Sequence, residues 1–408
     1  MSSGIRDRIV KLPTSKIREV AELGMGQTDA LPLWFGESDV PTPNFIKEAA
    51  KKGLDDNQTF YAPNNGLPIL RNAIATYMSD LYKTDIKADR ITVSASGMQA
   101  VMLTMQALVN EGDDVITVGP TWPNIPGAAS VLGGTPREVC LRETNGSWHL
   151  DLDDLFKAIT DKTKAIIINS PGNPTGWMMS SKDQFTVLNH CRKRGIWIVS
   201  DDVYARIVYD GRAAAPSFIE IANPEDRVIA INSFSKTWNM TGWRLGWITS
   251  PANIAKHYAM LTEFNIASAP PFIQLAGVEA LQKGEGFIMQ MKNDLQMKRD
   301  LVCHRLSQCS AVRVALPDAA FYVFFAVEGM TDSLATAKKI LTDTNVGLAP
   351  GAAFGDNAEG YLRLCFATST DLLTRALDRL IPFLESEFGK TNPVEIQKND
   401  RKVAHASQ

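Results

Sequence analysis

Short apolar runs alternate with longer amphipathic stretches between residues 90 and 250. A short apolar run bounded by turn-forming residues is typical of a buried strand, and apolar residues three or four positions apart are typical of a helix. The pattern predicts strands at residues 91–93, 115–118, 165–168, 196–200 and 228–231, and helices at residues 98–108, 152–159 and 184–194. This alternation favours a mostly parallel sheet with helices on both faces.

A second unit is predicted after this region. Residues 284–306 have the apolar spacing of a long helix with scattered charges, and residues 312–327 and 334–383 add further strand and helix patterns. Residues 391–408 are polar and have no periodicity, so we expect them to form a flexible tail. With 408 residues, the chain is long enough for a large α/β domain and a smaller one.

The composition narrows the class of protein. Charged residues make up 21% of the chain and the formal net charge is −3, so no basic face indicates binding to nucleic acid. The first residues carry charges, and no later stretch has the ~18 uninterrupted apolar residues of a membrane span, so we expect a cytoplasmic protein. The five cysteines are scattered and the five histidines lack ligand spacing, which predicts reduced, packed thiols and no metal site.

Residues 232–247 contain one lysine, Lys236, among small and hydroxylated residues, and an arginine eight positions later, Arg244. A lysine that bonds to an aldehyde must release its proton, and a desolvated pocket favours that release. The planar guanidinium of Arg244 and the hydroxyl of Ser233 are suited to a phosphate. The segment is therefore typical of an anchor for a phosphorylated aldehyde cofactor.

Two other segments place polar residues where a predicted strand ends. Residues 170–176, which include Asn173, follow the strand at 165–168, and Asp201, Asp202 and Tyr204 end or follow the strand at 196–200. Ligands of open α/β sheets bind at the carboxyl ends of the strands. We therefore expect these side chains to lie at one edge of the sheet.

In this order and at this separation, the three segments resemble those of fold type I pyridoxal phosphate enzymes, specifically the class I and II aminotransferase family. The resemblance extends from Gly36 through the turn at residues 61–66 to Arg363, and so covers roughly residues 30–385. It implies an aspartate aminotransferase-like α/β fold, with a large domain whose mostly parallel seven-stranded sheet is flanked by helices, plus a smaller α+β domain. The expected division is an N-terminal arm with part of the small domain at 1–45, the large pyridoxal phosphate-binding domain at 46–285, the small C-terminal domain at 286–390, and the flexible tail at 391–408.

The resemblance implies pyridoxal 5'-phosphate as the cofactor. It assigns catalytic roles to Lys236, which forms the Schiff base, to Asp201, which keeps the ring nitrogen protonated, and to Tyr204, which bonds to the phenolic oxygen. The phosphate is expected at a helix start, where free N–H groups and the helix dipole favour an anion. The implied cofactor-binding residues are Ser96, Gly97, Met98, Trp122, Asn173, Asp201, Tyr204, Ser233, Lys236, Arg244 and Tyr61. We interpret Asp202 as a capping or surface carboxylate without a catalytic role.

The resemblance also implies the substrate site and the assembly. Arg363, between two leucines, matches the arginine that binds the α-carboxylate of the amino acid, and Gly36, Asn173 and Trp122 complete the implied substrate-binding residues. Tyr61 matches a tyrosine that reaches the phosphate of the neighbouring subunit, so a homodimer with shared active sites is expected.

The implied activity is transfer of an amino group from an L-amino acid to a 2-oxo acid by a ping-pong mechanism. Met98 stands where relatives specific for aspartate often have a lysine or threonine, and it offers no charge to a distal carboxylate. Leu33, Trp34 and Phe35 lie in a segment that often borders the substrate side chain, which favours a neutral, apolar or aromatic amino acid. Packing of these three residues in the core is the alternative.

Several other functions share these motifs. A carbon–sulfur β-lyase, and more remotely a cyclopropane-forming synthase, would use the same Lys236, Asp201 and Arg363. A non-catalytic effector-binding domain of a transcription regulator would follow a DNA-binding domain, and about 30 residues before the first motif are too few for one. A protein that binds the cofactor without turnover is disfavoured because every chemical group is present.

Overall fold

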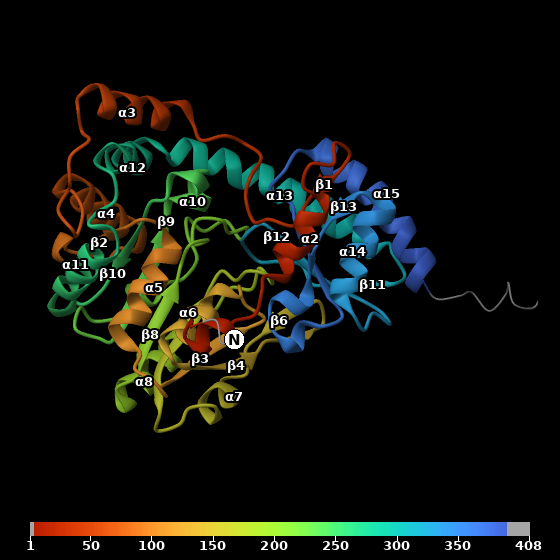
Figure 1. The fold of residues 1–408 in the computed structure, drawn as a ribbon, viewed down its shortest axis with the longest axis horizontal. Helices are drawn as coiled ribbons and strands as arrows, with labels where there is room; N and C mark the ends of the chain where they lie inside the picture. The colour runs from red at the N-terminus through yellow and green to blue at the C-terminus, as the bar shows by residue number, and fades with distance from the viewer. Residues whose placement is uncertain (1–3, 390–408) are drawn as a thin grey trace, which may run out of the picture.

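The computed structural model of the protein describes residues 4–389, so the tail predicted at residues 391–408 lies outside the described residues. Figure 1 shows a larger part, which holds the main sheet, and a smaller part that contains the C-terminal helices. The long helix α13 (Glu285–Ser307) runs from the first part to the second.

The main sheet has seven strands in the order β2-β10-β9-β8-β7-β3-β4. Strand β10 is antiparallel to both of its neighbours, and every other adjacent pair is parallel. The mostly parallel seven-stranded sheet is therefore confirmed. The strands in sheet order are β2 (Ile91–Ser94), β10 (Gly246–Thr249), β9 (Val228–Ser233), β8 (Trp197–Asp201), β7 (Thr163–Asn169), β3 (Asp114–Gly119) and β4 (Thr135–Cys140).

The hydrophobic pattern does not predict two of these strands, β4 and β10. Strand β4 lies at the edge of the sheet, and only Val139 in it is fully buried, so its sequence lacks the apolar run of a central strand. Pro136 is tolerated there because an edge strand has one side without ladder hydrogen bonds. Strand β10 begins at Gly246, at the end of the segment 232–247, and only Trp247 and Ile248 in it are large and apolar, so it does not stand out as an apolar run.

Helices cover both faces of the sheet because successive strand side chains point to opposite faces. On one face, Val115, Ile167 and Val199 pack with residues of α5 (Gly97–Leu108), α6 (Asn124–Leu132) and α11 (Ala252–Ile266). On the other face, Ile116 and Ile198 pack with residues of α7 (Leu152–Lys157), α8 (Ser181–Arg194) and α9 (Phe218–Ile221). The predicted helices on both faces are confirmed.

The second sheet is antiparallel, in the order β11-β12-β15-β14. Its strands are β11 (Val312–Val314), β12 (Tyr322–Val327), β15 (Tyr361–Cys365) and β14 (Ala349–Pro350), and the helices beside it are α14 (Ser333–Thr344) and α15 (Thr370–Phe388). The N-terminal segment joins this part, because β1 (Leu31–Pro32) pairs with β13 (Val346–Gly347) and α2 (Lys16–Gly24) packs on α14. The domain boundaries at residues 45, 285 and 390 stay a prediction.

The remaining elements complete the larger part. Helix α12 packs between α3 and α4, and a small hairpin follows β4. These elements are α1 (Asp7–Val10), α3 (Asn44–Asp55), α4 (Pro68–Tyr82), β5 (Arg142–Thr144), β6 (Ser147–His149), α10 (Phe234–Thr237) and α12 (Pro271–Lys283).

Within residues 4–389, no helix is both long enough and apolar enough to span a bilayer. All five cysteines are free thiols and four are buried, as the sequence predicts.

Candidate active site

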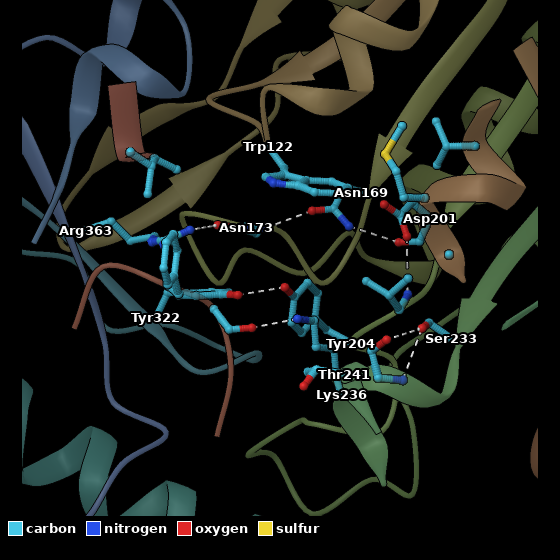
Figure 2. Close-up of a pocket in the computed structure, with 18 of the residues that line it drawn as sticks. Trp122, Asn169, Asn173, Asp201, Tyr204, Ser233, Lys236, Thr241, Tyr322 and Arg363 are labelled. Carbon is cyan, nitrogen blue, oxygen red and sulfur yellow. Dashed lines mark hydrogen bonds between the residues drawn. The ribbon is translucent and has the colours of Figure 1, made fainter. Parts of the chain in front are cut away.

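A cavity of about 260 Å³ lies at the carboxyl ends of β7, β8 and β9, where residues of the second sheet and the N-terminal segment also meet (Figure 2). The cavity brings together most of the side chains that the sequence predicts for the site. The predicted residues that line it are Gly36, Gly97, Met98, Trp122, Asn173, Asp201, Tyr204, Ser233, Lys236, Arg244 and Arg363. Ser96 and Tyr61 do not line it.

Lys236, in α10, extends its amine into the cavity from the carboxyl end of β9. The Nζ atom donates a hydrogen bond of 2.6 Å to the carbonyl oxygen of Gly36. Desolvation lowers the pKa of the Lys236 amine to about 8. Much more of the amine is therefore neutral near physiological pH than for an ordinary lysine, and the neutral form attacks a carbonyl carbon.

Asp201 ends strand β8 and is only 3% exposed. Its carboxylate accepts one long hydrogen bond, 3.4 Å from the backbone N–H of Val203, and Asn169 donates to the Asp201 backbone oxygen. Burial, and then the nearby Asp202, raise the pKa of Asp201 to about 7. A buried carboxylate with so few donors fits a cationic group in the cavity, such as a protonated ring nitrogen.

Asp202 is not the surface carboxylate that we expect from the sequence, because it is 2% exposed. It accepts hydrogen bonds from Ser200 (2.5 Å) and Ser217 (2.6 Å), and burial raises its pKa to about 6. It lines a separate small void beside Tyr82 and not the large cavity. The surface interpretation is therefore wrong.

The start of helix α5 lies at one end of the cavity. Ser96 is the N-cap residue, and its hydroxyl accepts a hydrogen bond of 3.1 Å from the N–H of Gln99. A Cβ atom on Gly97 would lie 3.3 Å from side-chain atoms of both Ser233 and Val203, so glycine keeps this corner open. Ser233 donates to Ser235 at 2.9 Å, and Arg244 also lines this region. A helix start, hydroxyl groups and a guanidinium together fit a phosphate.

Arg363, in β15, is 2% exposed and lies at the other end of the cavity (Figure 2). Its guanidinium donates to Asn173 Oδ1 at 2.8 Å and to the backbone oxygen of Trp34. It lies over the rings of Tyr322 and Phe354, with its Cζ atom 4.6 and 4.9 Å from their centroids. Its Nε is buried and has no hydrogen-bond partner among residues 4–389. This unused donor fits a carboxylate.

Tyr61 lies outside the cavity, with 91% of its surface exposed. Phe35 lines the cavity, whereas Leu33 and Trp34 are buried in the hydrophobic core. For these last two residues, the core-packing alternative is therefore correct.

The motifs do not predict several residues that line the cavity, among them Ile17, Asn169, Thr241 and Tyr322. Tyr322 belongs to an apolar run at residues 321–327 that reads as a core strand, and Ile17 belongs to an amphipathic helix. Asn169 could have been found, since it is the polar residue that ends the apolar run at 165–168.

Comparison with known proteins identifies the family to which the chain belongs. The chain matches the family model "Aminotransferase class I and II" over residues 28–380. It is 35% identical to an aspartate aminotransferase of Pyrococcus horikoshii over 94% of this chain and 98% of that protein. It is 35% identical to a probable aspartate/prephenate aminotransferase of Aquifex aeolicus over 94% of this chain and 100% of that protein.

A solved structure shares the fold. The crystal structure of an aromatic aminotransferase from Pyrococcus horikoshii has a TM-score of 0.84 and 33% sequence identity, and the match covers 91% of this chain and 99% of that one. The aspartate aminotransferase-like fold is thus confirmed. Because the family match spans nearly the whole chain, the chain belongs to the class I and II aminotransferases and is a transaminase.

Proposed function

We propose that the protein is a pyridoxal phosphate-dependent aminotransferase that moves an amino group from a neutral, apolar or aromatic L-amino acid to a 2-oxo acid by a ping-pong mechanism. One observation carries the proposal. The amine of Lys236, with a lowered pKa, shares one cavity with the buried carboxylate of Asp201 and the buried guanidinium of Arg363. These are the groups that amino transfer needs.

The cofactor would be held from several sides. Lys236 would bond covalently to its aldehyde, Asp201 would pair with its ring nitrogen, and Tyr204 and Asn173 would meet its phenolic oxygen. Trp122 would stack on the ring. The phosphate would bind at the start of α5, and the residues proposed to hold it are Ser96, Gly97, Met98, Ser233 and Arg244. When bound, pyridoxal phosphate supplies an electron sink for the bonds at the α-carbon.

Lys236 and Arg363 would carry out the steps on the substrate. Arg363 would bind the α-carboxylate with its planar fork, and so would fix the α-carbon in the cavity. The free amine of Lys236 would then take the proton from the α-carbon. A base with a pKa of about 8 suits this step, since a general base works best with a pKa near the working pH.

The proposed substrate class rests on the cavity lining. Ile17, Phe35, Met98 and Val101 provide apolar surface. Among the described residues that line the cavity, the cationic ones are Lys236, Arg244 and Arg363, and each has a proposed role with the cofactor or the α-carboxylate. A substrate with an apolar or aromatic side chain would therefore bury that side chain without an unpaired charge.

We also propose a homodimer with shared active sites. Phe60, Tyr61 and Phe264 are 79%, 91% and 84% exposed. Their segments lie side by side, because Asn64 donates to Glu263 at 2.9 Å and the N–H of Ala62 donates to Ser268 at 3.2 Å. Large exposed aromatic side chains that gather on one face are typical of an interface. Tyr61 would reach the phosphate site of the second subunit.

The proposal includes a cytoplasmic location. All five cysteines are free thiols, as is usual for proteins of a reducing compartment.

The proposal is tested by recording the absorbance spectrum of the cofactor-loaded protein while single amino acids are added without a 2-oxo acid. We expect apolar and aromatic amino acids to convert the band of the lysine-bound cofactor stoichiometrically to the pyridoxamine form, and a 2-oxo acid to restore it. Conversion by aspartate alone would contradict the substrate class. A band that persists while pyruvate and ammonia accumulate would identify a β-lyase instead.

A further inference from the structure

Two buried tyrosine hydroxyls meet inside the cavity (Figure 2). The oxygen atoms of Tyr204 and Tyr322 lie 2.7 Å apart, and the residues are 4% and 0% exposed. Tyr204 follows β8 in the seven-stranded sheet, whereas Tyr322 begins β12 in the four-stranded sheet. This hydrogen bond therefore joins the two parts of the molecule at the site itself.

Tyr322 also contacts two other parts of the site. Its ring lies under the guanidinium of Arg363, at 4.6 Å from the Cζ atom. A Cβ atom on Gly36 would lie 1.9 Å from the hydroxyl oxygen of Tyr322, so any residue other than glycine at position 36 would displace that hydroxyl. Gly36 in turn accepts the hydrogen bond from Lys236. One side chain thus touches the groups at the cofactor end and at the substrate end of the cavity.

The direction of the hydroxyl–hydroxyl bond follows from counting protons. Each phenol has one proton to donate. If Tyr204 donates its proton to the phenolic oxygen of the cofactor, its own oxygen is left as an acceptor, and Tyr322 must be the donor. Burial raises the pKa of Tyr322 well above its ordinary value, so this hydroxyl keeps its proton. A donated hydrogen bond makes the Tyr204 proton a stronger donor, because linked hydrogen bonds polarise one another.

We propose that Tyr322 is a positioning residue: its hydroxyl donates to Tyr204 and so strengthens the bond from Tyr204 to the cofactor, while its ring holds the guanidinium of Arg363 in place. This inference rests on the proposed function, since it needs the cofactor beside Tyr204. Tyr322 itself acts through Tyr204 and Arg363.

The test separates the hydroxyl from the ring. Tyr322→Phe removes the hydroxyl and keeps the ring. A weaker bond from Tyr204 leaves more negative charge on the phenolic oxygen, and this charge retains the proton on the neighbouring lysine-bound nitrogen. The absorbance change that reports loss of this proton should therefore occur at higher pH. The proton dissociation constant should fall about three- to tenfold, as expected for the loss of one hydrogen bond. We expect kcat to fall by a similar factor and KM to change little.

Two further variants make the test specific. Tyr322→Leu also removes the ring, so KM for the amino acid should rise as well. In a Tyr204→Phe background, Tyr322→Phe should cause no further shift in the absorbance titration, because the link is already broken. Tyr258→Phe is the matched control, since it removes another buried tyrosine hydroxyl, bonded to Thr104 at 3.4 Å and outside the cavity. It should leave the titration unchanged.

A titration of Tyr322→Phe identical to that of the wild type would overturn the inference. If Tyr322→Phe does not fold by circular dichroism, 3-fluorotyrosine at position 322 replaces it, because the fluorinated phenol keeps the shape and is a stronger donor. The absorbance change should then move to lower pH, and an unchanged titration would again reject the inference. A wild-type protein with no band of lysine-bound cofactor would instead reject the proposed function.

Discussion

At the scale of single residues, three ionisable groups in the cavity, Lys236, Asp201 and Arg363, form no salt bridge with residues 4–389. Buried charge without a partner is costly, and folding alone does not explain why three such groups share one cavity. A cofactor that bonds to Lys236 and pairs with Asp201, and a substrate carboxylate at Arg363, would supply the partners.

Replacing Arg363 by lysine should weaken substrate binding although the charge is kept. Lysine cannot form the two-pronged bond to a carboxylate, nor stack between Tyr322 and Phe354. We expect kcat/KM for the amino acid to fall about 10- to 100-fold in steady-state kinetics, mainly through KM. Arg375→Lys, at an exposed position of α15, is the control and should have no effect. An unchanged KM in Arg363→Lys would contradict the assignment.

Asp201→Asn should change how the stability of the cofactor-free protein depends on pH. The folded-state pKa of Asp201 is raised to about 7, so the folded protein holds this proton more tightly than the unfolded chain, and stability is lost as pH rises from about 4 to 7. Asparagine removes that loss. The free energy of unfolding of the variant, relative to wild type, should therefore increase by about 2 kcal/mol between pH 5 and pH 8.

Urea denaturation at the two pH values measures this difference. Asp161→Asn, at an exposed position, is the matched control and should show no such dependence. A difference between Asp201→Asn and wild type that does not vary with pH would show that the Asp201 carboxylate is not destabilised in the folded protein.

At the scale of elements, the start of helix α5 combines a helix cap with an unusual backbone conformation. Ser96 has a φ of 112°, in a region that favours glycine, while its hydroxyl caps the helix. The conformation turns the chain from β2 into α5 within a few residues, so the helix start faces the cavity. The backbone of Ser96 is therefore strained, and the surrounding structure holds it in this conformation.

Two substitutions separate the cap from the backbone strain. Ser96→Ala removes the cap and keeps the strain, so it should lower the free energy of unfolding by about 1 kcal/mol. Ser96→Gly also removes the cap but relieves the strain, and should cost only a few tenths of a kcal/mol. Chemical denaturation of the cofactor-free proteins compares them. An equal cost for both variants would show that the backbone at this residue is not strained.

At the scale of the whole molecule, the exposed aromatic face around Tyr61 and Phe264 leads to a prediction about assembly. If each active site combines Lys236 of one subunit with Tyr61 of the other, Lys236→Ala and Tyr61→Ala should complement each other. A mixed dimer has one site in which both residues are intact. After subunit exchange, about half of the dimers are mixed, and one of the two sites in each mixed dimer is intact. At limiting cofactor, about a quarter of wild-type activity should therefore return.

Each variant incubated alone at the same total concentration is the control and should stay poorly active under these conditions. Sedimentation velocity on the same samples reports whether dimers are present. Dimers that exchange subunits without any gain in activity would refute shared active sites, whereas monomers throughout would refute the dimer itself.

Local sequence patterns predict five of the seven strands of the main sheet, helices on both of its faces, and many of the residues that line the cavity. Apolar runs and polar strand ends are local features, and the carboxyl ends of parallel strands meet at one edge, so Asn173, Asp201 and Lys236 were predictable as neighbours. Strand β4 was not predictable, because an edge strand buries too little to leave an apolar run.

Which side chains beyond these motifs enter the site depends on tertiary packing. The hydrogen bond between Tyr204 and Tyr322 joins residues 118 positions apart, and Tyr322 lies outside every motif. Tyr322 reads as a core residue and Asp202 as a surface carboxylate, because a local pattern records neither the burial of Asp202 nor the distant partner of Tyr322. Contacts of this kind depend on how distant segments of the chain pack together, and a local pattern carries no record of that packing.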